Sequence, residues 1–169
     1  RLFAKAGMPL FVANSFSKSF SLYGERVGTL NVVAASTEEG ARVLSQIKRL
    51  VRANYSNPPT HGGKIVATVL TTPELRTLWE QELGHMRERI KSMRKLLVEK
   101  IHARVPGADF NFVTRQRGMF SYSGLTKEQV VRMREEFAVY AIESGRICVA
   151  ALNSKNVDYS ADAIAKVIA

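Results

Sequence analysis

The chain has 169 residues, 46% of them hydrophobic and 24% charged, which is the composition of an ordinary globular protein and not of a disordered one. No hydrophobic run approaches the roughly 20 residues that cross a bilayer, and the first residues lack the pattern of a signal peptide, so neither a membrane segment nor a membrane partner is expected. The formal net charge of +10 leaves nucleic acid, an anionic surface and small anions open as partners.

The chain carries one cysteine and three histidines. Cys148 cannot form an internal disulfide, which agrees with a reducing compartment, and we expect a cytoplasmic protein. His61, His85 and His102 are not spaced as ligands of one metal ion, so no metal site is expected.

Two short hydrophobic runs near the start, residues 9–15 and 27–35, predict buried strands because turn-forming residues bound each run. A serine-rich loop joins them. A capping-box pattern at residues 36–39 then predicts a helix that runs to Asn54, and the Asn-Pro-Pro-Thr break at residues 57–60 precedes a short helical segment.

A long amphipathic helix is predicted from Pro73 to Arg104, because apolar residues recur there every three or four positions. We expect this stripe to pack in a core and Gly84 to be a bend or hinge. At 1.5 Å per residue the helix would extend roughly 48 Å, too long for one small core, so it is expected to join two lobes. The apolar stripe comprises Leu75, Trp79, Leu83, Met86, Ile90, Met93, Leu97 and Ile101.

The last third of the chain reads as strand, helix, strand and closing helix. A strand is predicted around residues 118–123, and a capping box at residues 126–129 opens a helix that ends at Ser144-Gly145. A second strand at residues 146–150 and a weak final helix follow. This order predicts a small α/β lobe, with the boundary between lobes near His85.

Basic residues are concentrated in the long helix around Arg87–Lys95. They alternate with apolar positions and have acidic residues nearby, which favours a solvated helix face. A nucleic-acid-binding surface formed by this helix and the residues near Arg49 and Arg52 is the alternative.

The run from Asn14 to Gly28, Asn-Ser-Phe-Ser-Lys-Ser-Phe-Ser-Leu-Tyr-Gly-Glu-Arg-Val-Gly, contains the residues best suited to chemistry. The amine of Lys18 can form a Schiff base with an aldehyde, while serine hydroxyls and the Arg26 guanidinium can hold a phosphate. On spacing alone, Lys18 could equally be a solvated surface lysine.

This run resembles the cofactor-lysine segment of class I pyridoxal-phosphate aminotransferases, in the aspartate and aromatic-amino-acid group, and most of all its aromatic branch. Three further segments similar to that family follow in the family's order: Arg52–Pro59, Gly118–Gly124 and Ser144–Leu152. Asn57 stands where some aromatic-branch members carry serine, and Ala151 where many members carry glycine.

The resemblance implies an α/β fold that forms the carboxy-terminal part of a fold-type I pyridoxal-phosphate-dependent transferase. Residues 1–85 would be the end of the large cofactor-binding domain and residues 86–169 the small carboxy-terminal α/β domain. Because the family's amino-terminal part is longer than this whole chain, we expect the chain to be a fragment that is inactive alone.

The resemblance also implies roles for individual residues. Lys18 would form the Schiff base with pyridoxal 5'-phosphate and then move a proton, and Ser15 and Arg26 would hold the cofactor phosphate. Arg146 would bind the substrate α-carboxylate, and Arg52 would reach across a homodimer interface to a distal carboxylate.

Other roles remain open for several of these residues. Ser15 could instead stabilise a turn, and Arg26 could pair with Glu25 at the surface. Three further residues could line the substrate pocket or have core and turn roles: Tyr55, Asn57 and Phe120.

The expected function is therefore an aminotransferase that moves the amino group of aromatic amino acids, and of aspartate, to 2-oxoglutarate. Its expected partners are amino acids, 2-oxo acids and a second copy of the chain, with no nucleic acid. A basic nucleic-acid-binding module, and a regulatory or non-enzymatic protein with the same fold, are the alternatives.

Overall fold

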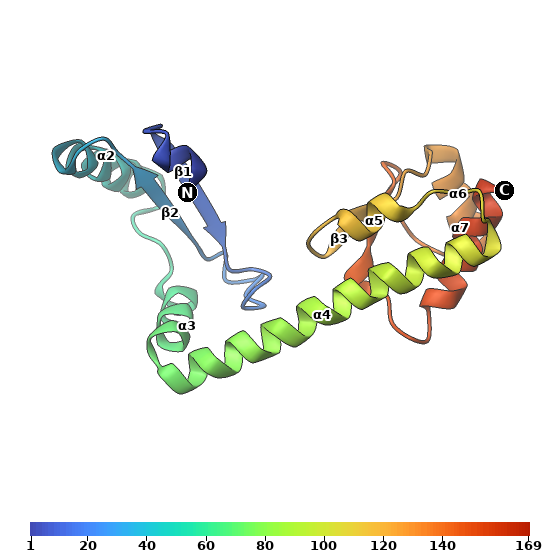
Figure 1. Cartoon of the computed structure of the whole chain (residues 1–169). Helices are drawn as coiled ribbons and strands as arrows, with labels where there is room; N and C mark the ends of the chain where they lie inside the picture. The colour runs from blue at the N-terminus through green and yellow to red at the C-terminus, as the bar shows by residue number, and fades with distance from the viewer. The chain divides into compact units, whose positions relative to one another are not determined.

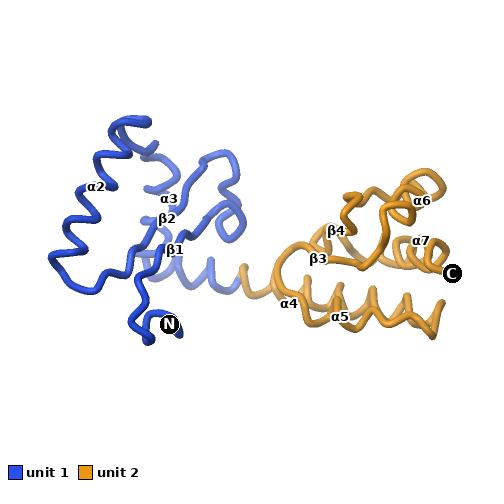
Figure 2. The backbone as a smooth tube through the Cα atoms, turned by 90° about the horizontal axis from the view of Figure 1, so that it is seen from above, with its two compact units in different colours: residues 1–81 blue, residues 82–169 orange.

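A computed structural model describes residues 1–169, and the chain divides into two compact units, residues 1–81 and 82–169, which are described separately (Figures 1 and 2). The division lies between Gln81 and Glu82, inside helix α4 (Pro73–Arg104). The assignment of residues 1–85 and 86–169 to a large and a small domain stays a prediction. None of the helices is both long and apolar enough to cross a bilayer.

The first unit contains a two-stranded antiparallel sheet. Strand β1 (Leu10–Ser15) pairs with β2 (Gly28–Val33), and the register runs to Ser15 opposite Gly28. A Cβ atom on Gly28 would lie 2.4 Å from the carbonyl oxygen of Asn14, so only glycine permits this approach. Both strands lie where the sequence predicts them, and a short helix that it does not predict, α1 (Leu2–Lys5), precedes them.

Two helices follow the sheet, α2 (Thr37–Tyr55) and α3 (Thr60–Thr71). The Ser36 hydroxyl caps α2 by accepting a hydrogen bond from the Glu39 amide at 3.2 Å. The Glu39 carboxylate accepts from the amide of Ala35 at 2.7 Å, one residue before the partner that a capping box predicts. No residue of α2 is buried in this chain.

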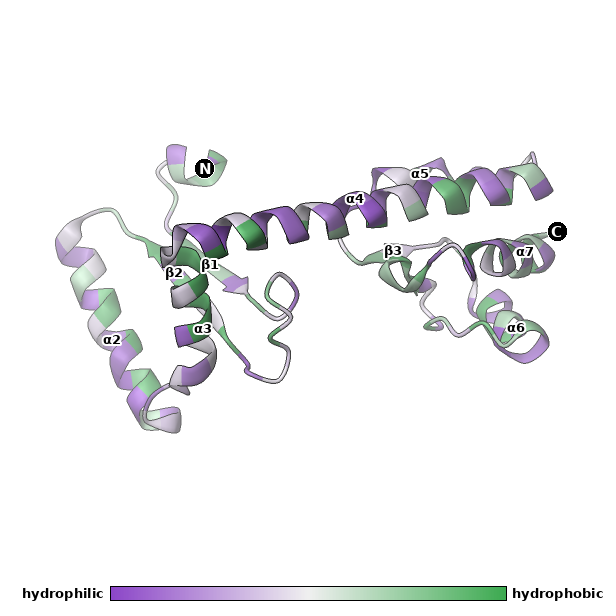
Figure 3. Cartoon of the chain, turned by 90° about the horizontal axis from the view of Figure 1, so that it is seen from below, coloured by the Kyte–Doolittle hydropathy of each residue, from purple (hydrophilic) through white to green (hydrophobic).

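The strands of the first unit are exposed, so the prediction that they are buried is wrong for this chain. Phe11 is 72% and Leu30 52% exposed, and Val66 of α3 is the only fully buried hydrophobic residue of the unit. Hydrophobic residues (green) are visible along β1, β2 and α3 in Figure 3. Their pattern is that of a covered sheet, but the unit has no third strand or packed helix that covers both faces of these two.

The second unit encloses the hydrophobic core. Besides the part of α4 from Glu82 onward, its elements are α5 (Asn111–Arg115), β3 (Phe120–Tyr122), α6 (Lys127–Phe137), β4 (Arg146–Cys148), a 3₁₀ turn η1 (Val149–Ala151) and α7 (Val157–Ile168). The strands β3 and β4 are antiparallel. The core consists of Leu97, Ile101, Leu125, Val130, Met133, Val149, Leu152, Val157, Ala161, Ile164 and Val167.

Helix α4 has the predicted bounds and continues without interruption through Gly84. Its apolar stripe is a core only in its second half: Leu97 and Ile101 are 1% and 0% exposed, whereas Leu75 and Met86 are 41% and 51% exposed. The expectation of core packing therefore fails for the first half, whose residues are exposed or half-buried in this chain.

Helix α6 begins with the predicted capping box but ends earlier than predicted. The Thr126 hydroxyl accepts from the Gln129 amide, and the Gln129 side chain accepts from the Thr126 amide. The helix ends at Phe137, not at Ser144-Gly145, because Ala138 adopts a left-handed conformation (φ 51°) and its amide turns back to the carbonyl of Arg134.

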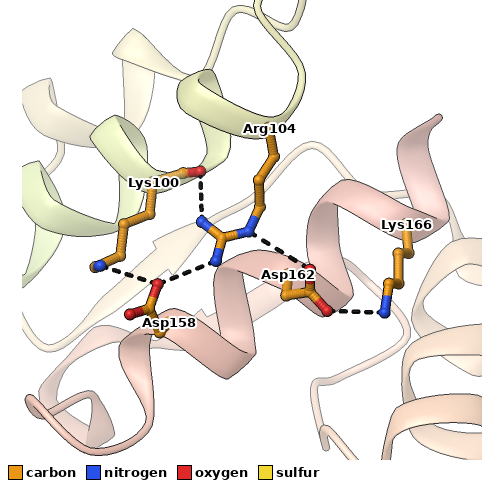
Figure 4. A network of polar contacts seen from close by, with 5 residues as sticks. All are labelled: Lys100, Arg104, Asp158, Asp162 and Lys166. Atoms are coloured by element: carbon orange, nitrogen blue, oxygen red, sulfur yellow. Dashed lines mark hydrogen bonds and ion pairs between the residues drawn. The ribbon is translucent and has the colours of Figure 1, made fainter.

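A network of surface ion pairs joins the end of α4 to α7 (Figure 4). Asp158 accepts from Lys100 at 2.9 Å and from Arg104 at 3.0 Å. Asp162 lies 3.5 Å from Arg104 and 2.9 Å from Lys166. The hydrogen bond from Lys100, and then that from Arg104, lower the pKa of Asp158; Lys166 lowers that of Asp162.

This network predicts an acid-sensitive contribution to stability. Because folding lowers the pKa of Asp158, the stabilisation is present above the unfolded-state pKa of about 4 and is lost as the pH falls through the lower folded value. Asp158→Asn should lower the melting temperature slightly at pH 7 and at low salt, and this difference from wild type should vanish toward pH 2 and at high salt. Glu99→Gln, an exposed acid of α4, is the control. Equal pH profiles for the two variants would contradict the prediction.

Candidate functional site

Lys18 lies in the loop that joins β1 to β2, as predicted, and its side chain is exposed. Its amine lies 4.6 Å from the ring centroid of Tyr23. The Lys18 ammonium group therefore faces an aromatic ring and not a carboxylate. Tyr23 is a neighbour that the sequence reading did not single out.

Main-chain hydrogen bonds shape this loop. The amide of Phe16 donates to Val27 at 3.1 Å, which extends the pairing of the strands beyond Ser15 and Gly28. The amide of Ser21 donates to the carbonyl of Lys18 at 3.3 Å and closes a turn around the lysine. The position of Lys18 is thus set by its own backbone.

Helix α4 contacts the β1–β2 loop through Trp79. The indole nitrogen of Trp79 donates to the carbonyl of Ser19 at 2.7 Å, and its ring stacks on Phe20 with centroids 4.7 Å apart. The Phe16 ring meets Phe20 edge-on at 5.4 Å. From the sequence, Trp79 is predicted to belong to a core stripe of the helix. Nothing in the sequence indicates its contact with the lysine loop.

Ser15 and Arg26 lie at the same end of the β1–β2 hairpin. The Ser15 hydroxyl oxygen accepts from the amide of Ser17 at 3.2 Å, so it does stabilise the turn, and its hydrogen remains available to a ligand. Arg26 has a left-handed backbone (φ 51°) and donates to the carbonyl of Tyr23 at 3.0 Å, without the surface pair to Glu25 that the sequence allowed.

Helix α3 supports this end of the hairpin through Gly62. A Cβ atom at Gly62 would lie 2.8 Å from the Cβ of Glu25 and 3.2 Å from that of Val27. The residues on either side of Arg26 therefore pack directly on a helix. Together, Ser15, Lys18 and Arg26 supply a hydroxyl, an amine and a guanidinium on one hairpin, a donor set that suits a phosphorylated aldehyde.

Arg146 belongs to the second unit, where it opens strand β4 opposite Tyr122 of β3. Its guanidinium carbon lies 4.9 Å from the centroid of the Phe120 ring. Ser121, between the two aromatic residues, is buried, so Phe120 and Tyr122 share the outward face with Arg146. Phe120 is 42% exposed and is thus part of this face and not of the core.

The hairpin around Arg146 is held by side chains. The Gln116 amide donates to the Tyr122 carbonyl at 2.9 Å and accepts from the Tyr122 amide at 2.8 Å. The Ser123 hydroxyl donates to the carbonyl of Gly145 at 2.7 Å. The sequence reading missed Gln116 and Ser123, because nothing in the pattern distinguishes such polar residues from solvated ones.

Arg52 lies near the end of α2 and is exposed, with its guanidinium donating to the hydroxyl of Ser56 at 2.7 Å. Tyr55 is 57% exposed, which excludes a core role in this chain. Asn57 is in the turn between α2 and α3, where its main-chain amide donates to the carbonyl of Tyr55 at 2.9 Å. No group of three or more His, Cys, Asp or Glu is placed to hold a metal ion.

The structure thus brings Ser15, Lys18 and Arg26 together on one hairpin and places Arg52 on a helix of the same unit. Arg146, with Phe120 beside it, lies in the second unit and is described there as a separate candidate group.

Comparison with known proteins identifies the family. The model of aminotransferases of class I and II matches residues 1–164, and the chain belongs to this family. It is 61% identical over 168 residues to an aspartate aminotransferase of Pseudomonas aeruginosa, covering 99% of this chain and 42% of that protein. It is 51% identical over 168 residues to an aromatic-amino-acid aminotransferase of Escherichia coli K12, with the same two coverages.

Comparison with solved structures supports the same family. A crystal structure of the aromatic-amino-acid aminotransferase from Burkholderia pseudomallei, covalently bound to pyridoxal phosphate, matches all of this chain and 42% of that chain, with a TM-score of 0.96 and 63% identity. The expectation of part of a fold-type I aminotransferase is confirmed. The chain spans 42% of the length of these relatives.

Gly145 directly precedes the strand that carries Arg146, and its backbone geometry predicts that only glycine is tolerated there. Gly145 has a φ of 81°, and a Cβ atom there would lie 2.9 Å from the carbonyl oxygen of Leu125 and 3.3 Å from the Tyr122 ring. Gly145→Ala should therefore lower the free energy of unfolding by about 2 kcal/mol in urea titrations. Gly107→Ala, with open space around its Cβ and no left-handed φ, is the control and should change little. Equal losses in both variants would count against this reading.

Proposed function

We propose that this chain is the carboxy-terminal part of an aminotransferase that moves the amino group of aromatic amino acids, and of aspartate, to 2-oxoglutarate. The observation that carries the proposal is the exposed amine of Lys18 on a well-anchored loop, with Ser15 and Arg26 at the same end of the hairpin. Relatives that match nearly the whole chain are named as aspartate and as aromatic-amino-acid aminotransferases, which supports both substrate classes.

The donor set fits pyridoxal 5'-phosphate as the cofactor. Lys18 would bind its aldehyde carbon, and the free hydrogen of the Ser15 hydroxyl and the Arg26 guanidinium would hold its phosphate. When bound, the cofactor supplies a conjugated ring that withdraws electrons from the substrate α-carbon. A backbone conformation uncommon for arginine at Arg26 is of the kind found at binding sites.

Lys18 would act twice in this reaction. Its amine would hold the aldehyde carbon of the cofactor before an amino acid binds, and its Nζ would then accept the proton of the substrate α-carbon. Proton transfer from the α-carbon requires the neutral form of this amine.

Arg146 would bind the substrate α-carboxylate with its planar fork of donors. Its exposed position on β4 leaves the guanidinium accessible, and the Phe120 ring beneath it restricts its orientation. The exposed face of Phe120 and Tyr122 would contact the apolar part of a substrate.

Arg52 would bind the distal carboxylate of a dicarboxylic substrate in a second copy of the chain. Helix α2 has no buried residue, and Leu44 and Leu50 are 51% and 63% exposed, so its surface is free to pack on a partner copy. Arg52 itself binds only a neighbouring hydroxyl on its own chain. These features support a homodimer with shared sites.

The basic residues of α4 do not favour the nucleic-acid alternative. Arg87 and Lys91 share the carboxylate of Glu88, and Arg89 and Arg94 donate to main-chain carbonyls. Few of these charges are left to contact a phosphate backbone. Cytoplasmic location is the proposed setting, as in the Dictyostelium discoideum relative whose name specifies it.

The cofactor assignment predicts covalent trapping at one lysine. Borohydride reduction of the full-length protein with pyridoxal 5'-phosphate, followed by peptide mapping, should place the reduced cofactor on Lys18. Lys18→Arg should abolish the label there and lower kcat by at least about a hundredfold, whereas Lys64→Arg, an exposed lysine of α3, should leave both unchanged. A label on another residue would defeat the assignment.

The substrate assignment predicts that arginine geometry, and not charge alone, is needed at position 146. Arg146→Lys should lower kcat/KM for aspartate and for tyrosine by at least about tenfold, because one ammonium cannot form the two parallel hydrogen bonds of a guanidinium. Arg132→Lys, an exposed arginine paired with Glu136 on α6, is the matched control. Near-normal rates in Arg146→Lys would remove Arg146 from the site.

A further inference from the structure

Arg94 is a buried cation. It lies on α4, is 3% exposed, and donates to four acceptors. Three of them are main-chain carbonyls, of Val113 at 3.2 Å, Gly118 at 2.6 Å and Phe120 at 2.9 Å, and the fourth is the hydroxyl of Ser121. All four acceptors are electrically neutral.

This arrangement is a costly way to stabilise a fold. Burial lowers the pKa of Arg94, and the positive charge of Arg117 lowers it further. The guanidinium gains hydrogen bonds but no opposite charge to offset its lost hydration. A hydrophobic residue in this place would avoid the cost of the buried charge but would leave these four acceptors without their donor. The guanidinium therefore holds the segment that carries these acceptors.

The four hydrogen bonds fix strand β3 and the residues that lead into it. Phe120 and Ser121 face Cys148 and Ile147 of β4 in the register, and Tyr122 faces Arg146. The ring of Phe120, whose own carbonyl Arg94 binds, lies against the Arg146 guanidinium. A displacement of β3 would therefore move both the ring and the strand that position Arg146.

A second arginine of α4, Arg89, holds the residues that follow β4 in the chain. Arg89 donates to the carbonyl of Ala150 and to that of Leu152, both at 2.8 Å. The segment that contains Arg146 is thus attached to one rigid helix both through β3 and beyond its own end. Arg89 is exposed, so only Arg94 carries the cost of burying a charge.

We propose that Arg94 is a positioning residue for Arg146: its guanidinium holds β3 so that the Phe120 ring and strand β4 keep Arg146 in the orientation that binds a carboxylate. The inference rests on the proposed role of Arg146 in binding the substrate α-carboxylate. It adds a residue that does not touch the substrate and acts through another.

The test uses Arg94→Lys and Arg94→Met in the full-length protein, with Arg87→Lys, an exposed arginine of the same helix, as the control. A lysine keeps the charge but cannot reach four acceptors, so both Arg94 variants should raise KM for tyrosine by about tenfold. Borohydride trapping at Lys18 should be unchanged. For tyramine, which lacks the carboxylate, kcat/KM should be the same in the wild type and the variants.

A double-mutant cycle separates positioning from a purely structural role. If Arg94 acts through Arg146, Arg94→Lys should raise KM little further in an Arg146→Lys background. A merely structural residue would lower the melting temperature and the active fraction, hence kcat, and leave KM unchanged, which would overturn the proposal.

Two failures can be told apart. If Arg146→Lys itself leaves KM unchanged, the proposed function of Arg146 fails, and this inference fails with it. If Arg146→Lys raises KM but no Arg94 variant does, only the inference fails. Should the Arg94 variants not fold, Ser121→Ala, which removes one acceptor and keeps the buried charge, must raise KM for tyrosine in the same direction by a smaller factor; no rise would overturn the proposal.

Discussion

The packing of Leu97 and Ile101 of α4 against α6 and α7 is the contact on which the second unit depends. These residues set the rotation of the helix about its axis. The helix then presents Arg94 to β3 and Arg89 to the residues that follow β4, and its end presents Lys100 and Arg104 to α7. This hydrophobic contact determines which polar groups of α4 can meet their partners.

Much of the fold could be predicted from local sequence rules. The bounds of α4, the capping box at Thr126 and the strands on either side of Lys18 follow from short-range patterns that need no tertiary information. The end of α6 could not be predicted, because the left-handed conformation of Ala138 is unusual for a residue with a Cβ atom. The signal expected at such a position is a glycine or an asparagine.

The candidate site shows the same division. Lys18, Arg26 and Arg146 were identified through resemblance of whole segments, and the structure adds the groups that hold them. Those groups could not be predicted, because Trp79 and Arg94 act on residues far away in the sequence, and each resembles a member of a core stripe or a solvated helix face. The prediction that the first-unit strands are buried is wrong for a related reason: a short hydrophobic run indicates that a strand needs to be covered, but not which part of the protein covers it.

The pairing of the Gln116 side chain with Tyr122 has a consequence for association between molecules. The primary amide offers one donor and one acceptor in the same geometry as a peptide group, so it occupies the place that a further strand would take beside β3. A strand edge with free amides and carbonyls is a template on which another chain can pair and aggregate. A single side chain here ends the sheet at two strands and leaves Tyr122 unable to recruit a neighbour.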